Sequence, residues 1–434
     1  MRYLIKSIAL SLAVILFCSI RAKGEDEISL LEKAGISVHG FADARGGVRS
    51  GEDEHQRDVI MGETRVQVDL ERMGDYTAWR VRSDFVYDDV ADDPEQDLEV
   101  GTGRIDLREA NVIISSDAPI DIKLGRQILT WGTGDLLFVN DMFPKDWQSF
   151  FIGRDEEYLK APSDAVMMSA FPSFANIDLV YTPRFDADRY ISGERISFWN
   201  PMLGAKSGRD DVVDAERRDD WLNDCELAGR ISKKIPGYEF AVYGYDGFEK
   251  SPGSFNEETG RVAFSRLRVY GASMVSQFGG GLLSAEGGYY DSISDREGDN
   301  PAVPNCQTRY LLGYERELWR DFTARFQYYV ELMSDYDRYL SSLQDTSTAK
   351  DEDRHLLTLR CTKLAMNQNM TLSLFIYYSP SDEDSYLRPI AKYKISDAWM
   401  VTLGGNVFLG EEDHTFFGQF EDNSNIYAGI RCSF

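Results

Sequence analysis

The 434-residue sequence has few histidines and cysteines, a shortage of positive charge and no long apolar segment beyond its first residues. After Gly24 no run of about 18 apolar residues occurs, so a membrane-spanning helix is not expected there. Lysine and arginine number 47 against 73 aspartates and glutamates, which gives a formal net charge of −26. This excess of negative charge argues against nucleic acid as a partner.

The five cysteines form no CxxC pair, so neither a metal centre nor another cofactor is expected. Cys225 and Cys306 both stand at the start of a predicted strand, and a disulfide between them is left open because an oxidising compartment would permit it. None of the four histidines lies in a recognisable nucleophile motif: His39, His55, His355 and His414. An enzyme is therefore not the expected function.

The first 24 residues have the three parts of a secretory signal peptide. Two basic residues open the chain, residues 7–20 form a short apolar stretch, and small residues up to Gly24 suit a cleavage site. We expect residues 1–24 to be removed as the signal peptide and residues 25–434 to form a single domain.

Most of the remaining sequence alternates between apolar and polar residues, as two-faced β-strands do. The stretch "TRVQVDLER" places Val66, Val68 and Leu70 on one face and charged or amide side chains on the other. Such stretches run for about 9–13 residues, the length that a tilted strand needs to cross a bilayer.

The connections between these stretches are alternately short and long. Tight turns are predicted near residues 73–75, 116–119, 172–175, 235–237, 278–281, 318–321, 367–369 and 397–399. Long polar segments are predicted at 47–59, 88–103, 131–162, 186–224, 249–261, 294–305, 335–353, 379–384 and 410–423. This rhythm predicts an all-β fold, a transmembrane antiparallel β-barrel of about 18 strands with long extracellular loops. Soluble sandwiches and propellers also alternate, but they do not explain the signal peptide and the loop rhythm together.

The sequence ends inside an alternating stretch, "NIYAGIRCSF", that finishes on Phe434. We expect this stretch to pair with residues 37–45 and so to close the barrel without an exposed edge. Aromatic residues near both ends of the predicted strands suit the two girdles of a membrane barrel. The expected partners are outer-membrane lipid and lipopolysaccharide, together with the barrel-assembly machinery, which would read the terminal Phe434.

The polar face of the predicted strands would line the lumen, and it carries many basic residues. The predicted pore-lining residues are Arg65, Arg80, Arg82, Arg309, Arg325, Arg360, Arg388, Lys392 and Arg431. Arg230, Arg266 and Arg268 are assigned to the same inward face. Together they suggest a lumen that attracts anions, whereas each arginine taken singly is expected to pair with an inward acid on a nearby strand.

The long segment 124–166 is unusually aromatic for a solvent-exposed loop. Because exposed apolar surface favours burial, we expect it to fold into the lumen and narrow the pore, with a lid over the barrel mouth as the alternative. Its predicted constriction residues are Trp131, Asp135, Asn140, Asp141, Lys145 and Asp146. The arginine-containing segment 186–224 is expected to act either as a second plug or as a surface cap.

Residues 108–116, "REANVIISS", and 120–135, "IDIKLGRQILTWGTGD", resemble the alginate-export porins of Gram-negative outer membranes and their uncharacterised relatives. The resemblance covers roughly residues 105–185, and the matching positions are Glu109, Arg126 and Gln127. It implies an 18-stranded barrel with an arginine-rich lumen, and a structural role at the root of the long loop for the matching residues.

These features predict a channel in the bacterial outer membrane that passes small or oligomeric polar solutes, with a small anionic solute as the preferred cargo. The alternative is a surface receptor or adhesin whose barrel is plugged, since acidic loops are also consistent with a docking function.

Overall fold

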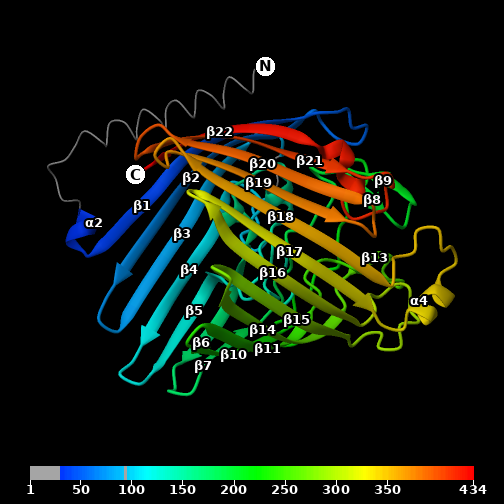
Figure 1. Ribbon diagram of the computed structural model, residues 1–434, viewed down its shortest axis with the longest axis horizontal. Coiled ribbons are helices and arrows are strands. Elements are labelled where there is room, and N and C mark those ends of the chain that lie inside the picture. Colours follow the sequence, from blue (N-terminus) through cyan, green and yellow to red (C-terminus); the bar gives the residue numbers. More distant parts are fainter. Residues whose placement is uncertain (1–29, 92–94) are drawn as a thin grey trace.

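The computed structural model describes residues 30–91 and 95–434, so the predicted signal peptide lies outside the described residues. The described chain is dominated by one 18-stranded antiparallel sheet that closes on itself (Figure 1). Two small hairpins and a few short helices lie in the connections.

The barrel strands are β1 Ile36–Arg49, β2 Val59–Met73, β3 Thr77–Asp88, β4 Ile105–Ser115, β5 Ile120–Ile128, β6 Pro162–Ala170, β7 Asn176–Thr182, β10 Glu226–Ile235, β11 Tyr238–Phe248, β14 Arg266–Phe278, β15 Gly281–Ser292, β16 Gln307–Trp319, β17 Phe322–Met333, β18 Asp353–Ala365, β19 Met370–Ser379, β20 Asp384–Lys394, β21 Trp399–Leu409 and β22 Asn425–Ser433. The hairpins are β8 Phe198–Asn200 with β9 Ala205–Ser207, and β12 Ser254–Asn256 with β13 Arg261–Ala263. The helices are α2 Leu30–Lys33, α3 Trp147–Ile152 and α4 Tyr336–Ser342, with 3-10 turns η1 Glu156–Leu159 and η2 Gly418–Asn423.

Each barrel strand pairs with the next one along the chain, and β22 returns to pair with β1. The closing register runs from Phe41 opposite Ser433 to Arg49 opposite Asn425. Phe434 extends this pairing, because it exchanges backbone hydrogen bonds with Gly40 at 2.9 and 3.0 Å. Closure leaves neither terminal strand with an open edge, and it confirms the predicted partnership of the two ends of the barrel.

The connections fall into the two predicted classes. One end of the barrel, the short-turn end, carries tight links such as Gly74–Tyr76 between β2 and β3. The other end, the long-loop end, carries the extended segments, of which the longest joins β7 to β10. No helix among the described residues is long and apolar enough to cross a membrane.

Alternation along the strands separates an apolar outer wall from a largely polar inner wall. In β22, Ile426 is exposed on the outer wall, while Asn425 and Tyr427 are buried inside. Leu312 and Leu403 are likewise exposed on the outside. An apolar exterior of this kind would be costly in water and favourable in lipid.

Strand β14 reverses the predicted assignment of faces. Leu267 and Val269 point inward and are buried in a cluster with Phe143 of the β5–β6 connection. Arg266 and Arg268 therefore lie on the outer wall, not in the lumen as the alternation suggested. The reason is that a connecting segment packs against this part of the inner wall and makes it apolar.

The four cysteines in the described part of the chain, Cys225, Cys306, Cys361 and Cys432, form no disulfide. Cys306 and Cys432 are buried. Among the described residues no three His, Cys, Asp or Glu side chains cluster closely enough to hold a metal ion.

The barrel closure can be tested with two matched glycine substitutions in β1. A Cβ at Gly40 would lie 2.3 Å from the carbonyl oxygen of Gln67 and 2.7 Å from the Phe434 ring, whereas a Cβ at Gly46 meets no atom closer than 4.0 Å. We expect Gly40→Ala to destabilise the folded barrel by about 1–3 kcal/mol through overpacking, and Gly46→Ala to be tolerated. The measurement is the urea midpoint of unfolding in detergent micelles, and equal midpoints for the two variants would contradict the closure geometry.

Candidate functional site

The segment that joins β5 to β6, residues 129–161 and here called the inner loop, runs through the inside of the barrel. It bonds to side chains from strands around the circumference: Glu286 of β15, Gln327 of β17, Tyr377 of β19, Asn425 of β22, Glu63 of β2 and Asp84 of β3. A segment that touches opposite walls of a closed barrel must lie within it. The predicted inward folding of this aromatic loop is therefore confirmed.

Local sequence shapes the inner loop at the helix α3. Asp146 caps the helix N-terminus, because its carboxylate accepts a hydrogen bond from the Ser149 backbone N–H at 2.7 Å. Gly153 ends the helix in a left-handed conformation, with φ at 95°. A Cβ on Gly153 would lie 2.3 Å from the Tyr427 ring, so glycine also allows the loop to approach the wall closely.

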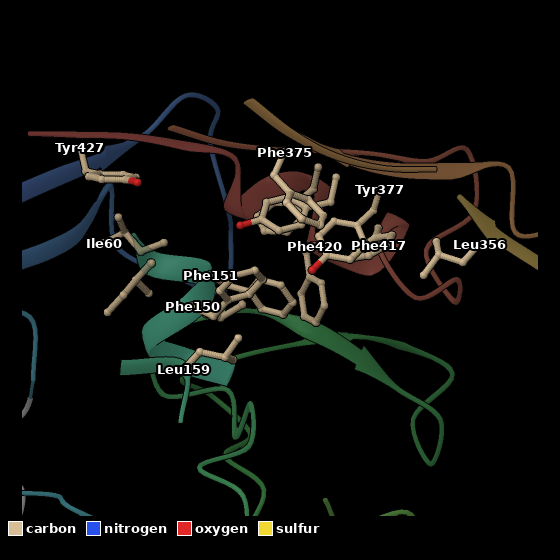
Figure 2. Close-up of a cluster of buried hydrophobic side chains, with 14 of the residues drawn as sticks. Ile60, Phe150, Phe151, Leu159, Leu356, Phe375, Tyr377, Phe417, Phe420 and Tyr427 are labelled. Atoms are coloured by element: carbon tan, nitrogen blue, oxygen red, sulfur yellow. The ribbon is translucent and has the colours of Figure 1, made fainter. Parts of the chain in front are cut away.

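Aromatic side chains fill the lumen on the β18–β22 side. Phe150 and Phe151 of α3 point toward Phe417 and Phe420, which belong to the β21–β22 connection (Figure 2). The Phe151 ring centroid lies 5.0 Å from that of Phe420 and 5.3 Å from that of Phe408 on the wall. Contacts of this kind contribute roughly 0.5–1.5 kcal/mol each beyond area burial, so this side of the lumen is firmly packed.

Three carboxylates of the inner loop form ion pairs with basic residues of the barrel wall. Asp155 lies 2.8 Å from Lys392 and 2.6 Å from Arg431, and it also pairs with Arg45. These neighbours hold the pKa of Asp155 below its usual range, although burial opposes them.

Glu156 and Asp135, the other two carboxylates, pair with arginines of β18 and β20. Glu156 lies 3.0 Å from Arg360 and 3.1 Å from Arg388, and Asp135 lies 2.7 Å from Arg360. The loop thus neutralises a block of positive charge on β18, β20 and β22.

The other predicted pore-lining bases are also paired with acids. Arg80 and Arg82 contact Asp69 and Glu109, Arg65 contacts Glu63 and Asp84, Arg309 contacts Glu331 at 3.4 Å, and Arg325 contacts Glu315 at 3.5 Å. Each of the nine predicted bases therefore has a carboxylate partner. For Arg360, Arg388 and Lys392 those partners come from the inner loop and not from a neighbouring strand.

Residues 183–215, which are part of the connection between β7 and β10 and are here called the strap, pack on the inner loop. Asp188 accepts hydrogen bonds from the Lys145 backbone N–H at 2.7 Å and from the Trp147 indole N–H at 3.0 Å. Arg189 lies 3.3 Å from Asp146 and 2.8 Å from Asp106 of β4. The strap therefore holds the inner loop against the long-loop side of the lumen.

A cavity of about 680 Å³ remains on the other side of the inner loop. Residues of β2, β3, β4 and β10 line the cavity on the barrel side, and residues from both ends of the inner loop line it on the other side. The charged residues that line it are Arg82, Arg108, Glu109, Asp135, Asp141, Glu156, Glu157, Lys160 and Arg230. Trp131 contributes an aromatic face, and the Arg230 guanidinium carbon lies 5.8 Å from the centroid of that ring.

Two basic residues of the cavity escaped the sequence prediction. Arg108 is an extra residue in β4, because the register shifts there so that Arg82 opposes Glu109 and Ser83 opposes Leu107. Such a β-bulge lets two adjacent side chains serve one face, which strict alternation does not foresee. Lys160 lies at the end of the inner loop, where no strand pattern assigns a direction.

Lys160 differs from the other charged residues of the cavity. Arg82, Arg108 and Arg230 each have an acidic partner, and every acidic residue of the lining has a basic partner within 4.0 Å. Among the described residues, the Lys160 ammonium forms no ion pair.

The predicted constriction residues separate into two groups. Trp131, Asp135 and Asp141 line the cavity. Asn140, Lys145 and Asp146 do not: Asn140 bonds to Glu286 at 2.9 Å, Lys145 pairs with Asp141 at 3.1 Å, and Asp146 caps α3. All three are buried because the loop folds back on itself and on the strap.

The residues of the sequence motif also have different surroundings. Glu109 faces the cavity between Arg80, Arg82 and Lys123. Gln127 is fully buried and donates to the Ala165 carbonyl at 2.9 Å. Arg126 lies on the opposite face of β5, where it pairs with Asp164 at 2.6 Å.

No family model matches the sequence, and no curated protein matches it. Solved structures do resemble the fold. Acinetobacter baumannii OccAB1 is 9% identical with a TM-score of 0.53, covering 95% of this chain and 99% of its own. Pseudomonas aeruginosa OccD3 (OpdP) is 12% identical with a TM-score of 0.52, covering 92% and 91%. Pseudomonas aeruginosa OccK11 (OpdR) is 7% identical with a TM-score of 0.51, covering 92% and 96%. At these identities the likeness extends to the fold, which is that of the outer-membrane porins.

Asp155 offers a test of the charge balance between loop and wall. Asp155→Asn keeps the shape but leaves Arg45, Lys392 and Arg431 with less compensating charge, so we expect a loss of about 3 kcal/mol in the free energy of unfolding. The control is Asp413→Asn, whose side chain is 55% exposed and whose partner Lys206 keeps Asp422, so its loss is expected to stay below about 1 kcal/mol. Urea unfolding in micelles measures both, and equal losses would argue against a central role for Asp155.

The buried carboxyl group of Asp186, in the strap, leads to a prediction of how the stability of the fold depends on pH. Burial, together with the nearby Glu226 and Asp164, raises the pKa of Asp186 to about 7, although Lys250 opposes them. An acid with a raised pKa in the folded state stabilises the fold at low pH, and this contribution falls as the pH rises from about 4 to about 7. We therefore expect Asp186→Asn to match the wild type at pH 4.5 and to be more stable at pH 7.5, as measured by urea midpoints. The same difference at both pH values would refute the assignment.

Proposed function

We propose that this chain is an outer-membrane channel for small polar solutes with a preference for anions. The closed barrel with an apolar outer wall and the fold likeness to porins support a place in the bacterial outer membrane. The observation that carries the channel proposal is the cavity of about 680 Å³ that the inner loop leaves between itself and the β2–β10 wall. A loop that narrowed the lumen without sealing it would leave such a space.

The anion preference rests on Lys160. The strand arginines that suggested a basic lumen are each paired with a carboxylate, so their charges are largely compensated locally. Lys160 is among the residues that line the cavity, and among the described residues its ammonium forms no ion pair. In a narrow, partly desolvated space a single fixed charge acts strongly on passing ions, because the effective dielectric constant is lower than in bulk water.

The identity of the solute and one competing function remain predictions. The resemblance of residues 105–185 to the alginate-export porins would make an acidic oligosaccharide one candidate solute. The competing function is a receptor or adhesin with a plugged lumen, and the observation that favours it is the aromatic packing that fills the β18–β22 side.

Conductance in a planar bilayer under a salt gradient tests these proposals. We expect the mature wild-type protein to conduct with anion selectivity, and Lys160→Gln to lower the anion-to-cation permeability ratio at least about two- to fivefold, since a unit charge at close range is worth roughly 1 kcal/mol even in bulk water. Lys350→Gln removes the same charge from an exposed loop and is expected to leave the ratio unchanged.

The other outcomes are equally informative. An equal shift in both variants would mean that Lys160 has no special role. A cation-selective wild type would overturn the anion preference while keeping the channel. A silent wild-type barrel would favour the plugged receptor.

A further inference from the structure

A charged row lies on the outer wall at the long-loop end of β11, β14 and β15. In the register of the sheet, Asp246 stands opposite Arg268, and Arg268 stands opposite Asp291. Arg268 contacts Asp246 at 2.5 Å, Arg266 contacts the same carboxylate, and Arg296 contacts Asp291 at 2.7 Å. Charged side chains on the lipid-facing side of a membrane barrel are unfavourable at the bilayer midplane, so their presence calls for a polar environment at this height.

The height of this row follows from its neighbours on the same face. One step further toward the short-turn end, the outward residues are Tyr270 and Tyr289, which stand opposite each other. Tyr310 of β16 continues this exposed band. Tyrosines on the outside of a membrane barrel favour the level where the hydrocarbon meets the headgroups. The charged row lies two residues beyond them, about 7 Å, and thus within the headgroup layer.

The three arginines keep donors available for a ligand. Arg266, Arg268 and Arg296 have side chains that are 34%, 42% and 56% exposed. In the hydrogen bonds of the described residues, Arg266 and Arg268 each use one nitrogen for Asp246 and Arg296 uses two for Asp291, although a guanidinium carries five N–H donors. Three guanidiniums face two carboxylates, so the row carries excess positive charge on a chain whose net charge is −26.

We propose that Arg266, Arg268 and Arg296, here called the arginine row, bind the phosphate groups of an outer-leaflet lipid headgroup. Planar guanidinium groups suit bidentate recognition of phosphate, and the tyrosine band below them would contact the start of the acyl chains. The proposal rests on the proposed membrane location but not on conduction or selectivity, since none of these side chains faces the lumen.

Native mass spectrometry of the mature protein in detergent micelles tests the arginine row. The probe is bisphosphorylated lipid A, compared with the same glycolipid after removal of both phosphates. We expect the wild type to retain lipid A and to bind the dephosphorylated form at least about tenfold more weakly, a difference of roughly 1.4 kcal/mol. The triple variant R266Q/R268Q/R296Q is expected to lose this preference.

The matched control is R217Q/R261Q/R338Q, which removes three ion-paired, exposed arginines from the connections. It is expected to bind lipid A like the wild type. Equal binding of both lipids by the wild type, unchanged binding by the first triple variant, or an equal loss in both variants would each overturn the proposal.

Insertion into planar bilayers, measured on the same preparations, separates this result from the proposed function. A wild type that fails to insert would refute the membrane location itself. A wild type that inserts and shows no phosphate preference would refute only the arginine row.

Discussion

The interior of this barrel depends on the pairing of inner-loop carboxylates with basic residues of the wall. Asp155 alone contacts bases from β1, β20 and β22, and Glu156 joins β18 to β20. Neither set of charges could stay buried without the other, because an uncompensated charge in a partly desolvated lumen costs several kcal/mol. The wall is therefore basic where the loop lies against it, and its composition there reflects packing against the loop.

This pairing also decides where space remains. The loop is drawn toward β18–β22 by its carboxylates and held there by Phe150 and Phe151 against wall aromatics (Figure 2). On the opposite side, Arg82 and Arg230 pair with acids of the wall itself, and the loop meets that wall through Trp131, which lies beside Arg230. The cavity of about 680 Å³ lies between the loop and this wall.

The sequence predicted the barrel well, because local alternation and turn residues indicate the strand lengths, the order of short and long loops, and the closure of the barrel. It failed where tertiary contacts overrule alternation. In β14, Leu267 and Val269 turn inward because Phe143 packs there, and Arg266 and Arg268 are displaced to the outside. The inward position of Arg108 depends on a β-bulge, which an alternating pattern does not reveal. The positions of Asn140, Lys145 and Asp146 depend on how the loop itself folds, and alternation does not reveal this either.

The electrostatic character of the lumen cannot be obtained by counting the charged residues of the strands. As a set the nine predicted bases suggested a lumen that attracts anions, while each was expected to pair with an acid, and each of them does have a carboxylate within 4.0 Å. Paired charges form dipoles whose fields decay quickly in salt, whereas a lone ammonium acts over roughly a Debye length, about 8 Å at physiological ionic strength. Lys160, which lines the cavity and forms no ion pair among the described residues, therefore acts at longer range than the paired bases, and it belongs to the loop and not to the wall.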